Sequence, residues 1–294
     1  MTKLRLAAAV ACMALIAGSA NAADLPSRKA APVYVPPAPT FSWTGLYGGV
    51  NIGYGFGNGD QDQGGLGWLT VAGAFPAGWT LPNDLNGVLG GGQIGYNWQF
   101  NPWLVVGVEA DIQAADLNFN SSGGAASGTV NPAVFQLVAV NQNKAVDWFG
   151  TVRGRIGVTP FIPNLLIYAT GGFAYGQVVH TLSVSDTFTN GAAFGIPALG
   201  SGYYDNTNTG WTVGGGVEWF PLLSSPLFRS FSVKVEYLYT DLGATNLTGL
   251  SFNFAPAAGA FGFAHTSETR FHLVRAGLNW HFNPFAPAPV VAKY

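Results

Sequence analysis

Residues 88–100 decide the fold and read Val88-Leu89-Gly90-Gly91-Gly92-Gln93-Ile94-Gly95-Tyr96-Asn97-Trp98-Gln99-Phe100. The even positions carry mainly apolar and aromatic side chains, whereas the odd positions carry Gln93, Asn97 and Gln99 with glycines between them. Successive side chains on a β-strand point to opposite faces of the sheet. This stretch therefore predicts a strand with one apolar face, ending in aromatic residues, and one polar face.

The same alternation recurs about eight times along the chain, and the composition indicates where the apolar faces point. Only 9% of the residues are charged, 14% are aromatic and 41 are glycine, whereas soluble proteins average about 25% charged residues. After the N-terminus no apolar run reaches the roughly 18 residues of a membrane-spanning helix, and lipid otherwise admits only closed sheets. We therefore expect an all-β fold, an eight-stranded antiparallel transmembrane β-barrel with long external loops.

The first 22 residues are typical of a secretory signal peptide. Lys3 and Arg5 precede a short apolar segment, and Ala20-Asn21-Ala22 supplies a small-x-small cleavage site. Cys12, the single cysteine, lies inside this segment, so we expect a mature chain without disulfides. Removal of Lys3 and Arg5 leaves ten basic and fourteen acidic residues, a net charge of −4. These features predict export to the outer membrane of a Gram-negative bacterium and exclude a basic nucleic-acid surface.

The mature chain divides into a proline-rich periplasmic linker at 23–42, the barrel at 43–282 and a C-terminal tail, Asn283–Tyr294. The expected strands span residues 45–56, 87–100, 103–114, 146–158, 165–177, 210–220, 230–242 and 271–282. In the fourth of them the side chains predicted to face outward are Val146, Trp148, Val152, Ile156 and Val158. Short and long connections alternate, with the long ones at 57–86, 115–145, 178–209 and 243–270. Barrels of this kind have short periplasmic turns and long external loops, which places both termini in the periplasm.

Aromatic residues cluster near both ends of the expected strands, as at the two interfaces of a membrane. The periplasmic girdle is predicted to contain Trp43, Trp98, Phe100, Trp103, Trp219, Trp280 and Phe282. The external girdle is predicted to contain Tyr54, Phe56, Trp148, Tyr175, Trp211 and Tyr239.

All mid-strand charges fall on the polar phase, which faces the lumen. These predicted site residues are Glu109, Asp111, Arg153, Arg155, Glu218, Lys234, Glu236 and Arg275. Glu109 and Arg153 lie at similar heights on neighbouring strands, as do Glu236 and Arg275, so we expect an interior salt-bridge network. Because eight strands enclose a lumen wide enough only for side chains, a structural plug is favoured over a conducting filter.

The remaining motifs give no catalytic, cofactor or metal site. Residues 90–95 fit G-x-G-x-x-G, but a strand rather than a helix follows, so we interpret the glycines as allowing close strand packing. The histidines lack metal-ligand spacing, and His265 and His272, near the last external loop, are interpreted as exposed spectators, with a haem or metal contact there as the less favoured alternative. We therefore expect no enzyme, no cofactor and no metal. Acidic residues in the external loops are interpreted as ordinary solvated charge, with cation bridging to lipopolysaccharide as the alternative.

Four stretches resemble one known family. They are residues 41–49 (FSWTGLYGG), 147–157 (DWFGTVRGRIG), 233–243 (VKVEYLYTDLG) and 274–282 (VRAGLNWHF). Together they resemble the small outer-membrane β-barrel surface antigens of alphaproteobacteria, which carry a porin-family label and are related to the OmpA membrane domain. The resemblance implies an eight-stranded barrel with roles in envelope integrity and surface interaction, and some members are described as porins or haem binders. The proline-rich tail after Phe282 departs from the family pattern.

The sequence thus predicts a structural and surface-display protein of the outer membrane. A narrow porin-like channel and loop-mediated binding of a ligand or adhesion partner stay open as alternatives. Expected partners are outer-membrane lipid, lipopolysaccharide and the barrel-assembly machinery, together with a surface ligand of unknown identity.

Overall fold

The computed structural model describes residues 40–68, 77–131, 134–189, 198–221, 230–253, 259–282 and 285–286. The chain divides into two compact units, and the described residues all belong to the unit Thr40–Ala286. The described residues contain no helix long and apolar enough to cross a membrane. The strands are β1 (Thr40–Phe41), β2 (Gly45–Gly57), β3 (Asp60–Trp68), β4 (Ala77–Asn83), β5 (Gly87–Asn101), β6 (Leu104–Asn131), β7 (Val134–Val158), β8 (Leu165–Thr189), β9 (Ala198–Trp219), β10 (Phe231–Asn253), β11 (Gly259–His281) and β12 (Phe285–Ala286).

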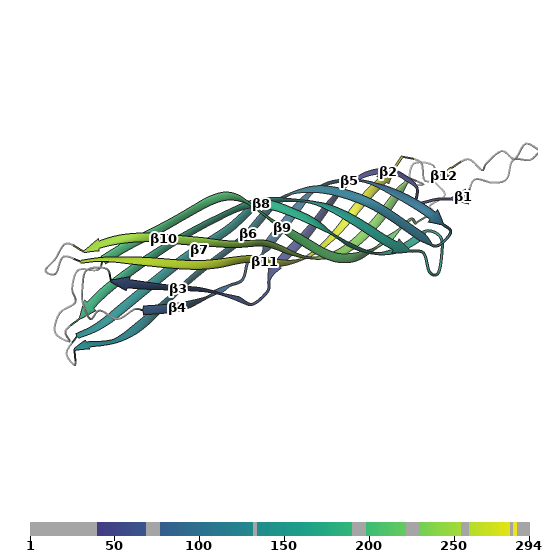
Figure 1. The fold of residues 1–294 in the computed structure, drawn as a ribbon. Coiled ribbons are helices and arrows are strands. Elements are labelled where there is room, and N and C mark those ends of the chain that lie inside the picture. The colour runs from purple at the N-terminus through teal and green to yellow at the C-terminus, as the bar shows by residue number, and fades with distance from the viewer. Residues whose placement is uncertain are drawn as a thin grey trace, which may run out of the picture. The chain divides into compact units, whose positions relative to one another are not determined.

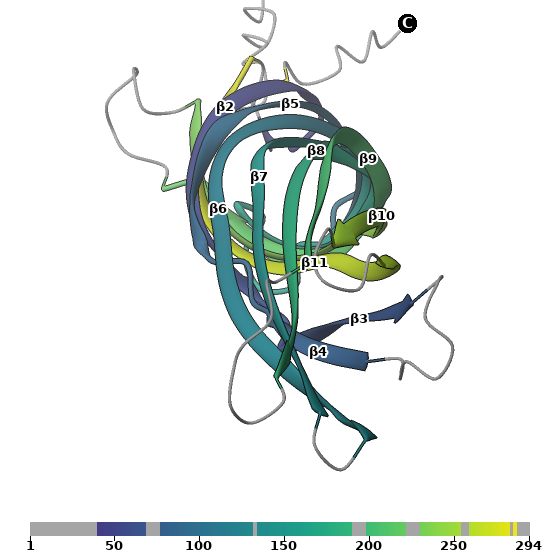
Figure 2. The same ribbon diagram turned by 90° about the vertical axis from the view of Figure 1, so that its left-hand side faces the viewer.

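Eight antiparallel strands close into a ring, which confirms the predicted barrel (Figures 1 and 2). The order is β2–β5–β6–β7–β8–β9–β10–β11, and β11 returns to pair with β2. Following the paired residues once around the ring leads from Tyr47 in β2 to Gly57 in the same strand, a stagger of ten residues. Such a stagger tilts the strands against the barrel axis, and closure leaves no unpaired edge within the ring.

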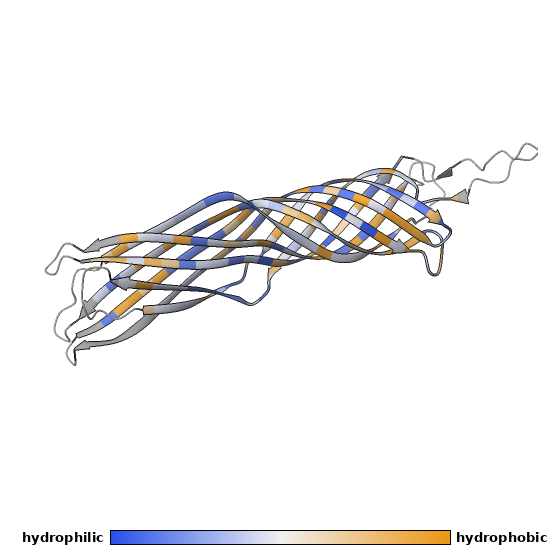
Figure 3. Cartoon of the chain, viewed as in Figure 1, coloured by the Kyte–Doolittle hydropathy of each residue, from blue (hydrophilic) through white to orange (hydrophobic). Residues whose placement is uncertain are grey.

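The outer face of the ring is apolar between two belts of aromatic side chains. Val50 and Ile52 are 63% and 70% exposed, and along the strands hydrophobic positions alternate with hydrophilic ones (Figure 3). The belt near the short turns contains exposed Trp98, Trp103 and Trp280, as predicted. We call this side the short-turn end. The opposite side, which carries β3 and β4, is the hairpin end.

Trp43 was predicted for the aromatic belt of the short-turn end, and this prediction is wrong. Its side chain is 0% exposed and packs edge-on against Phe220, with ring centroids 5.0 Å apart. Its indole Nε1 donates a hydrogen bond to the Pro163 carbonyl at 2.8 Å. Trp43 thus lies inside the mouth of the barrel, in an apolar cap with Val105, Leu166, Tyr168 and Phe220. Next to this cap, β1 pairs with β12 through Phe41 and Phe285.

The four long connections are present, but most of their described residues continue the strands rather than form irregular loops. Strand β6 runs for 28 residues instead of the predicted twelve, and in the first connection the strands β3 and β4 pair with each other. Beyond the ring, β6–β9 form one sheet. The strands β10, β11, β3 and β4 form a second sheet. Within the described residues, β9–β10 pairing ends at Trp211 and Asp241, where the two sheets separate.

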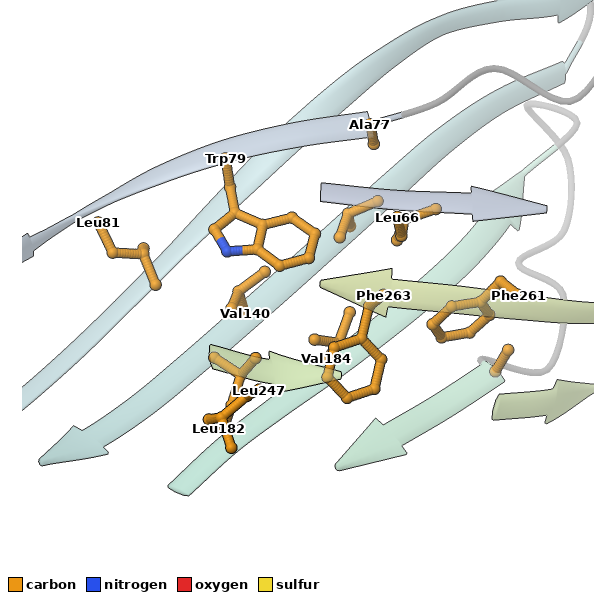
Figure 4. Packing of buried hydrophobic residues seen from close by; sticks show 12 residues of the cluster. Leu66, Ala77, Trp79, Leu81, Val140, Leu182, Val184, Leu247, Phe261 and Phe263 are labelled. Atoms are coloured by element: carbon orange, nitrogen blue, oxygen red, sulfur yellow. The ribbon is translucent and has the colours of Figure 1, made fainter. Parts of the chain in front are cut away.

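A hydrophobic core fills the space between these two sheets (Figure 4). Trp79 from β4 and Phe261 and Phe263 from β11 face the first sheet, which contributes Val140 and Leu182. The hairpin end is therefore a β-sandwich, in which two facing sheets enclose an apolar interior. Most exposed positions of its outer face are polar or small, with Leu137, Leu199 and Leu250 as exceptions, so the inside-out pattern of the barrel reverses beyond the aromatic belt.

Irregular pairing marks the height at which this reversal occurs. The register shifts between Ala114 and Leu117 in β6, between Val146 and Phe149 in β7, and between Asp241 and Ala244 in β10. A β-bulge adds a residue to one strand and so exchanges the faces that later side chains occupy. Val146, predicted to face outward, is therefore fully buried. The alternation that places Val152 on the outer face does not continue to Val146, because the bulge between Val146 and Phe149 reverses it.

The glycines at 90–92 provide a test of close strand packing. A Cβ added at Gly91, on the inner face, would lie 2.0 Å from the Ile112 carbonyl oxygen, whereas one at Gly92 would come no nearer than 3.6 Å to any atom. We predict that Gly91→Ala destabilises the folded barrel by about 1–3 kcal/mol, because β5 and β6 must move apart. Gly92→Ala is the matched control. Equal urea midpoints for both variants in lipid vesicles would contradict the close approach.

Candidate functional site

The eight predicted lumen residues converge inside the barrel. Glu109 and Asp111 come from β6, Arg153 and Arg155 from β7, Glu218 from β9, Lys234 and Glu236 from β10, and Arg275 from β11. All eight side chains are buried. They lie on the inward phase of their strands, opposite the apolar residues that face outward. We call these eight residues the lumen charge network.

Strand register sets the neighbours within this network. Glu109 pairs directly with Arg153 across β6 and β7, and Glu236 pairs directly with Arg275 across β10 and β11. Directly opposed residues in antiparallel strands bring their Cβ atoms within about 5.5 Å. The strand register alone therefore places opposite charges side by side, independently of any contact across the lumen.

Arg153 lies at the centre of the network. Its Nη2 is 2.6 Å from Glu109 Oε1 and 2.9 Å from Asp111 Oδ2, and its Nη1 is 3.0 Å from Glu236 Oε1. Arg275 completes the group, with Nη2 lying 2.8 Å from Asp111 Oδ2 and 2.6 Å from Glu236 Oε2. The planar guanidinium group suits this role because its five donors lie in a fixed fork. Two arginines thus link three carboxylates from two sides of the ring.

A second group of contacts lies around Glu218. Its Oε2 accepts a hydrogen bond from Arg155 Nη2 at 2.7 Å, and its Oε1 accepts one from Asn279 Nδ2 at 2.9 Å. The guanidinium carbon of Arg155 lies 4.0 Å from the centroid of the Tyr168 ring, a cation–π contact. Arg155 connects this part to the centre, since its Nη1 also lies 3.6 Å from Glu109 Oε2. Lys234, which is directly opposite Glu218 in the β9–β10 register, contacts Glu109 Oε1 through its Nζ at 2.8 Å.

Several neutral partners were missed by the sequence reasoning. Tyr47 donates a hydrogen bond to Glu109 Oε2 at 2.7 Å, Tyr168 donates to Glu236 Oε1 at 3.0 Å, and Thr151 donates to Asp111 Oδ2 at 2.8 Å. All three residues lie on the inward phase of their strands, so the alternation contained the necessary signal. Their hydroxyl groups carry no formal charge, so the pattern of charged residues alone does not point to them.

Apolar layers lie on both sides of the charges. The cap around Trp43 and Phe220 covers the short-turn end. Towards the hairpin end, buried Leu89, Phe149 and Phe271 belong to a second apolar cluster. The network is balanced, with four acidic and four basic groups. From the short-turn end to the hairpin end, the barrel interior therefore contains an apolar layer, a layer of paired charged side chains and a second apolar layer.

A second polar cluster lies in the hairpin end, outside the band between the aromatic belts. Asp62, Lys144, His180 and His265 are all buried there, so the interpretation of His265 as an exposed spectator is wrong. Burial lowers the pKa of His180 to about 3 and that of His265 to about 4, with Lys144 adding to both shifts. Burial also lowers the Lys144 pKa to about 8 and raises the Asp62 pKa.

Comparison with known proteins identifies relatives across nearly the whole chain. The profile of the outer membrane protein beta-barrel domain matches residues 9–282. The 31 kDa outer-membrane immunogenic protein of Brucella melitensis is 34% identical over 279 residues, covering 92% of this chain and 96% of that protein. The 22 kDa outer membrane protein of Rhizobium leguminosarum is 32% identical, covering 51% of this chain and 52% of that protein. The solved structure of OprG from Pseudomonas aeruginosa is 9% identical with a TM-score of 0.36, covering 82% of this chain and 98% of that one.

The central position of Arg153 predicts a large loss of stability on truncation. Arg153→Ala removes one of the two guanidinium groups that pair with Glu109, Asp111 and Glu236, and only Arg275 then bridges the three carboxylates. Removing one partner from a buried ion pair costs about 3–5 kcal/mol. The matched control is Arg270→Ala, because Arg270 pairs with Asp241 at a partly exposed site, where an ion pair contributes about 0–1 kcal/mol. Thermal unfolding in detergent measures both. An unchanged melting temperature for Arg153→Ala would contradict the network.

The buried histidines predict acid sensitivity of the hairpin end. Their folded pKa values lie below the unfolded value of about 6.5, so the unfolded state binds more protons, and stability falls as pH falls through 6.5 towards 4. The raised pKa of Asp62 has the opposite effect on stability, because the folded state then binds the extra proton. We expect the two histidines together to outweigh this single carboxyl group. The urea midpoint should therefore drop between pH 7 and pH 4.5, and less so in His180→Leu. A midpoint independent of pH would refute this assignment.

Proposed function

The chain belongs to the outer membrane protein beta-barrel domain family, and from that premise we propose that its role is structural. The barrel anchors the protein in the outer membrane and contributes to envelope integrity, while the hairpin end is displayed at the cell surface. The observation that carries this proposal is the filled interior. A solute would have to displace the Trp43 cap, the lumen charge network and the second apolar cluster.

The proposed orientation follows from the lengths of the two ends. The short-turn end, with both neighbouring strands β1 and β12, faces the periplasm, and the extended hairpin end faces outward. The apolar band then contacts lipid. Exposed carboxylates at Asp116, Asp147 and Asp205 flank the outward belt, where divalent cations can link them to lipopolysaccharide phosphates. The barrel-assembly machinery is the expected partner during insertion.

A narrow porin-like channel is the alternative that this geometry disfavours. Conduction needs the guanidinium groups of Arg153 and Arg275 to line water, yet both are ion-paired to carboxylates on neighbouring strands. Opening a path would separate several buried ion pairs together, which is costly in a low-dielectric interior.

A binding role has one specific observation in its favour. The outer face of the β6–β8 sheet carries a hollow of about 320 Å³ lined by amide and hydroxyl groups, among them Asn120, Asn141, Asn143, Thr181 and Ser183. Such groups suit the hydroxyls of a saccharide. Loss of cell-surface glycan binding in an Asn141→Ala, Asn143→Ala variant of intact fold would support this second function. Undiminished binding in that variant would remove it.

The structural role predicts electrical silence. The folded protein in a planar lipid bilayer should give no discrete conductance steps, with folding verified by a heat-dependent shift on a gel. A strain that lacks the protein should become more sensitive to detergent, and the wild-type chain should restore its resistance. Reproducible conductance steps from the folded protein would instead establish the channel and overturn the proposal.

A further inference from the structure

Three potential metal ligands meet between the two sheets of the hairpin end. Asp62 comes from β3 and His265 from β11 in one sheet, while His180 comes from β8 in the facing sheet. One ligand atom of each residue lies within 4.8 Å of the other two. All three side chains are at most 1% exposed. The cluster is therefore held by three strands and lies away from solvent.

His180 gives an independent indication of a ligand. Within the described part of the chain, neither of its ring nitrogens has a hydrogen-bond partner. Its ring faces that of His265, with centroids 5.3 Å apart and ring planes inclined by 62°. A buried nitrogen that makes no hydrogen bond is costly, and such groups are rare in folded proteins. An imidazole of this kind has a free lone pair directed into a cluster of metal-ligand types.

We propose that Asp62, His180 and His265 form a binding site for a divalent transition metal ion, with Zn²⁺ the best match. Two imidazoles and one carboxylate are a donor set found at three-ligand zinc sites, which leave a fourth position for water. Imidazole donors favour zinc and its neighbours over calcium or magnesium. Zinc–ligand distances are about 2.0–2.2 Å, so the three ligand atoms must approach by roughly 1 Å on binding.

Neighbouring side chains already support the carboxylate. Asp62 Oδ1 accepts a hydrogen bond from Asn83 Nδ2 at 2.8 Å, and its Oδ2 accepts one from Ser267 Oγ at 2.7 Å. Such outer contacts fix the orientation of metal ligands. His265 Nε2 faces Asp62, at 4.0 Å from its Oδ2, and also lies 3.0 Å from Gln142 Oε1, a further oxygen donor beside the site.

Binding through His265 Nε2 would move the remaining ring proton to Nδ1. Trp79 Nε1 donates a hydrogen bond to Nδ1 at 3.2 Å, so two N–H groups would then oppose one another. The indole must therefore turn away from the ring. This makes Trp79 a natural reporter, because its fluorescence should change when the metal binds.

Lys144 is the charge that competes with the metal. Its Nζ donates hydrogen bonds to Ser267 Oγ at 2.7 Å and to the Glu268 carbonyl at 2.5 Å, and Ser267 in turn contacts Asp62. An ammonium group at this position repels a second cation in a low-dielectric interior. Removal of the Lys144 charge should therefore tighten metal binding, an effect opposite to that of ligand removal.

The separation between β9 and β10 gives the ion a route to the site. His180 pairs with Tyr204 of β9, and His265 pairs with Leu247 of β10. Each histidine thus lies one strand from the seam where β9–β10 backbone pairing has ended. Among the described residues, β9 and β10 have no backbone pairing beyond Trp211 and Asp241, and side chains such as Asn208 and Thr245 make contact across the seam. Ion access there requires no ladder hydrogen bonds to break.

The test is a titration of the folded protein with Zn²⁺ alone in detergent, using competition against a colorimetric chelator. We expect one ion per chain, and binding weakened at least about tenfold in His180→Ala and in Asp62→Asn. Lys144→Met should bind more tightly. His272→Ala is the matched control, because His272 contacts Tyr237 and Asn58 at an exposed position, and it should bind like the wild type.

Cobalt substitution and fluorescence provide readouts that a merely structural role would not move. Bound Co²⁺ should show the visible absorption of a four-coordinate nitrogen and oxygen site, and the metal-induced change in emission should vanish in Trp79→Phe. A heat-dependent gel shift verifies that each variant is folded. If His180→Ala is not folded, His180→Gln is used in its place. Absence of zinc binding, equal binding by the cluster variants, or loss of binding in His272→Ala would each overturn the proposal.

Discussion

Closure of eight strands into a ring determines what the interior of this protein can contain. A ring of this size leaves an interior that side chains must fill, and any polar group placed there is removed from water. Arg153 illustrates the consequence, because its guanidinium group contacts carboxylates from β6 and β10 at once. The ladder places Glu109 beside it and Arg275 beside Glu236, so opposite charges meet by register. The same closure that satisfies the backbone in lipid therefore demands a paired and charge-balanced interior.

A second constraint acts where the strands leave the membrane. Outside lipid, an apolar outer face is unfavourable, and the chain reverses its pattern while the strands continue. In β8, outward Phe173 gives way to outward Ser183, whereas the inward positions change from Thr170 to Leu182. Bulges in β6, β7 and β10 occur at this height, and the ring separates into two sheets around Trp79 and its neighbours. The hairpin end thus resembles a soluble β-sandwich continuous with a membrane barrel.

These two constraints explain what the sequence could and could not predict. Between the aromatic belts the alternation is strong, so the eight strands, their inward charges and the two described short turns, at 102–103 and 159–164, were predictable from residues such as Glu109 and Trp98. The third predicted short turn lies mostly outside the described residues. Beyond the belts the apolar side chains lie on the inner face and polar side chains on the outer face, so these segments resemble polar external loops in sequence. Val146 was misassigned because a bulge exchanges faces without changing composition. The meeting of Asp62, His180 and His265 depends on two facing sheets and left no trace in sequence spacing.

One continuous strand, β8, changes from a lipid-facing to a water-facing outer surface while its inner surface stays packed. Cys12 is the single cysteine, so a chain without it accepts one new cysteine at a time along β8. In lipid vesicles, Phe173→Cys should react only with a membrane-soluble maleimide, Ser183→Cys also with an impermeant one, and Leu182→Cys with neither. Rapid reaction of Leu182→Cys with the impermeant reagent would mean that this segment is an open loop, and would contradict the account.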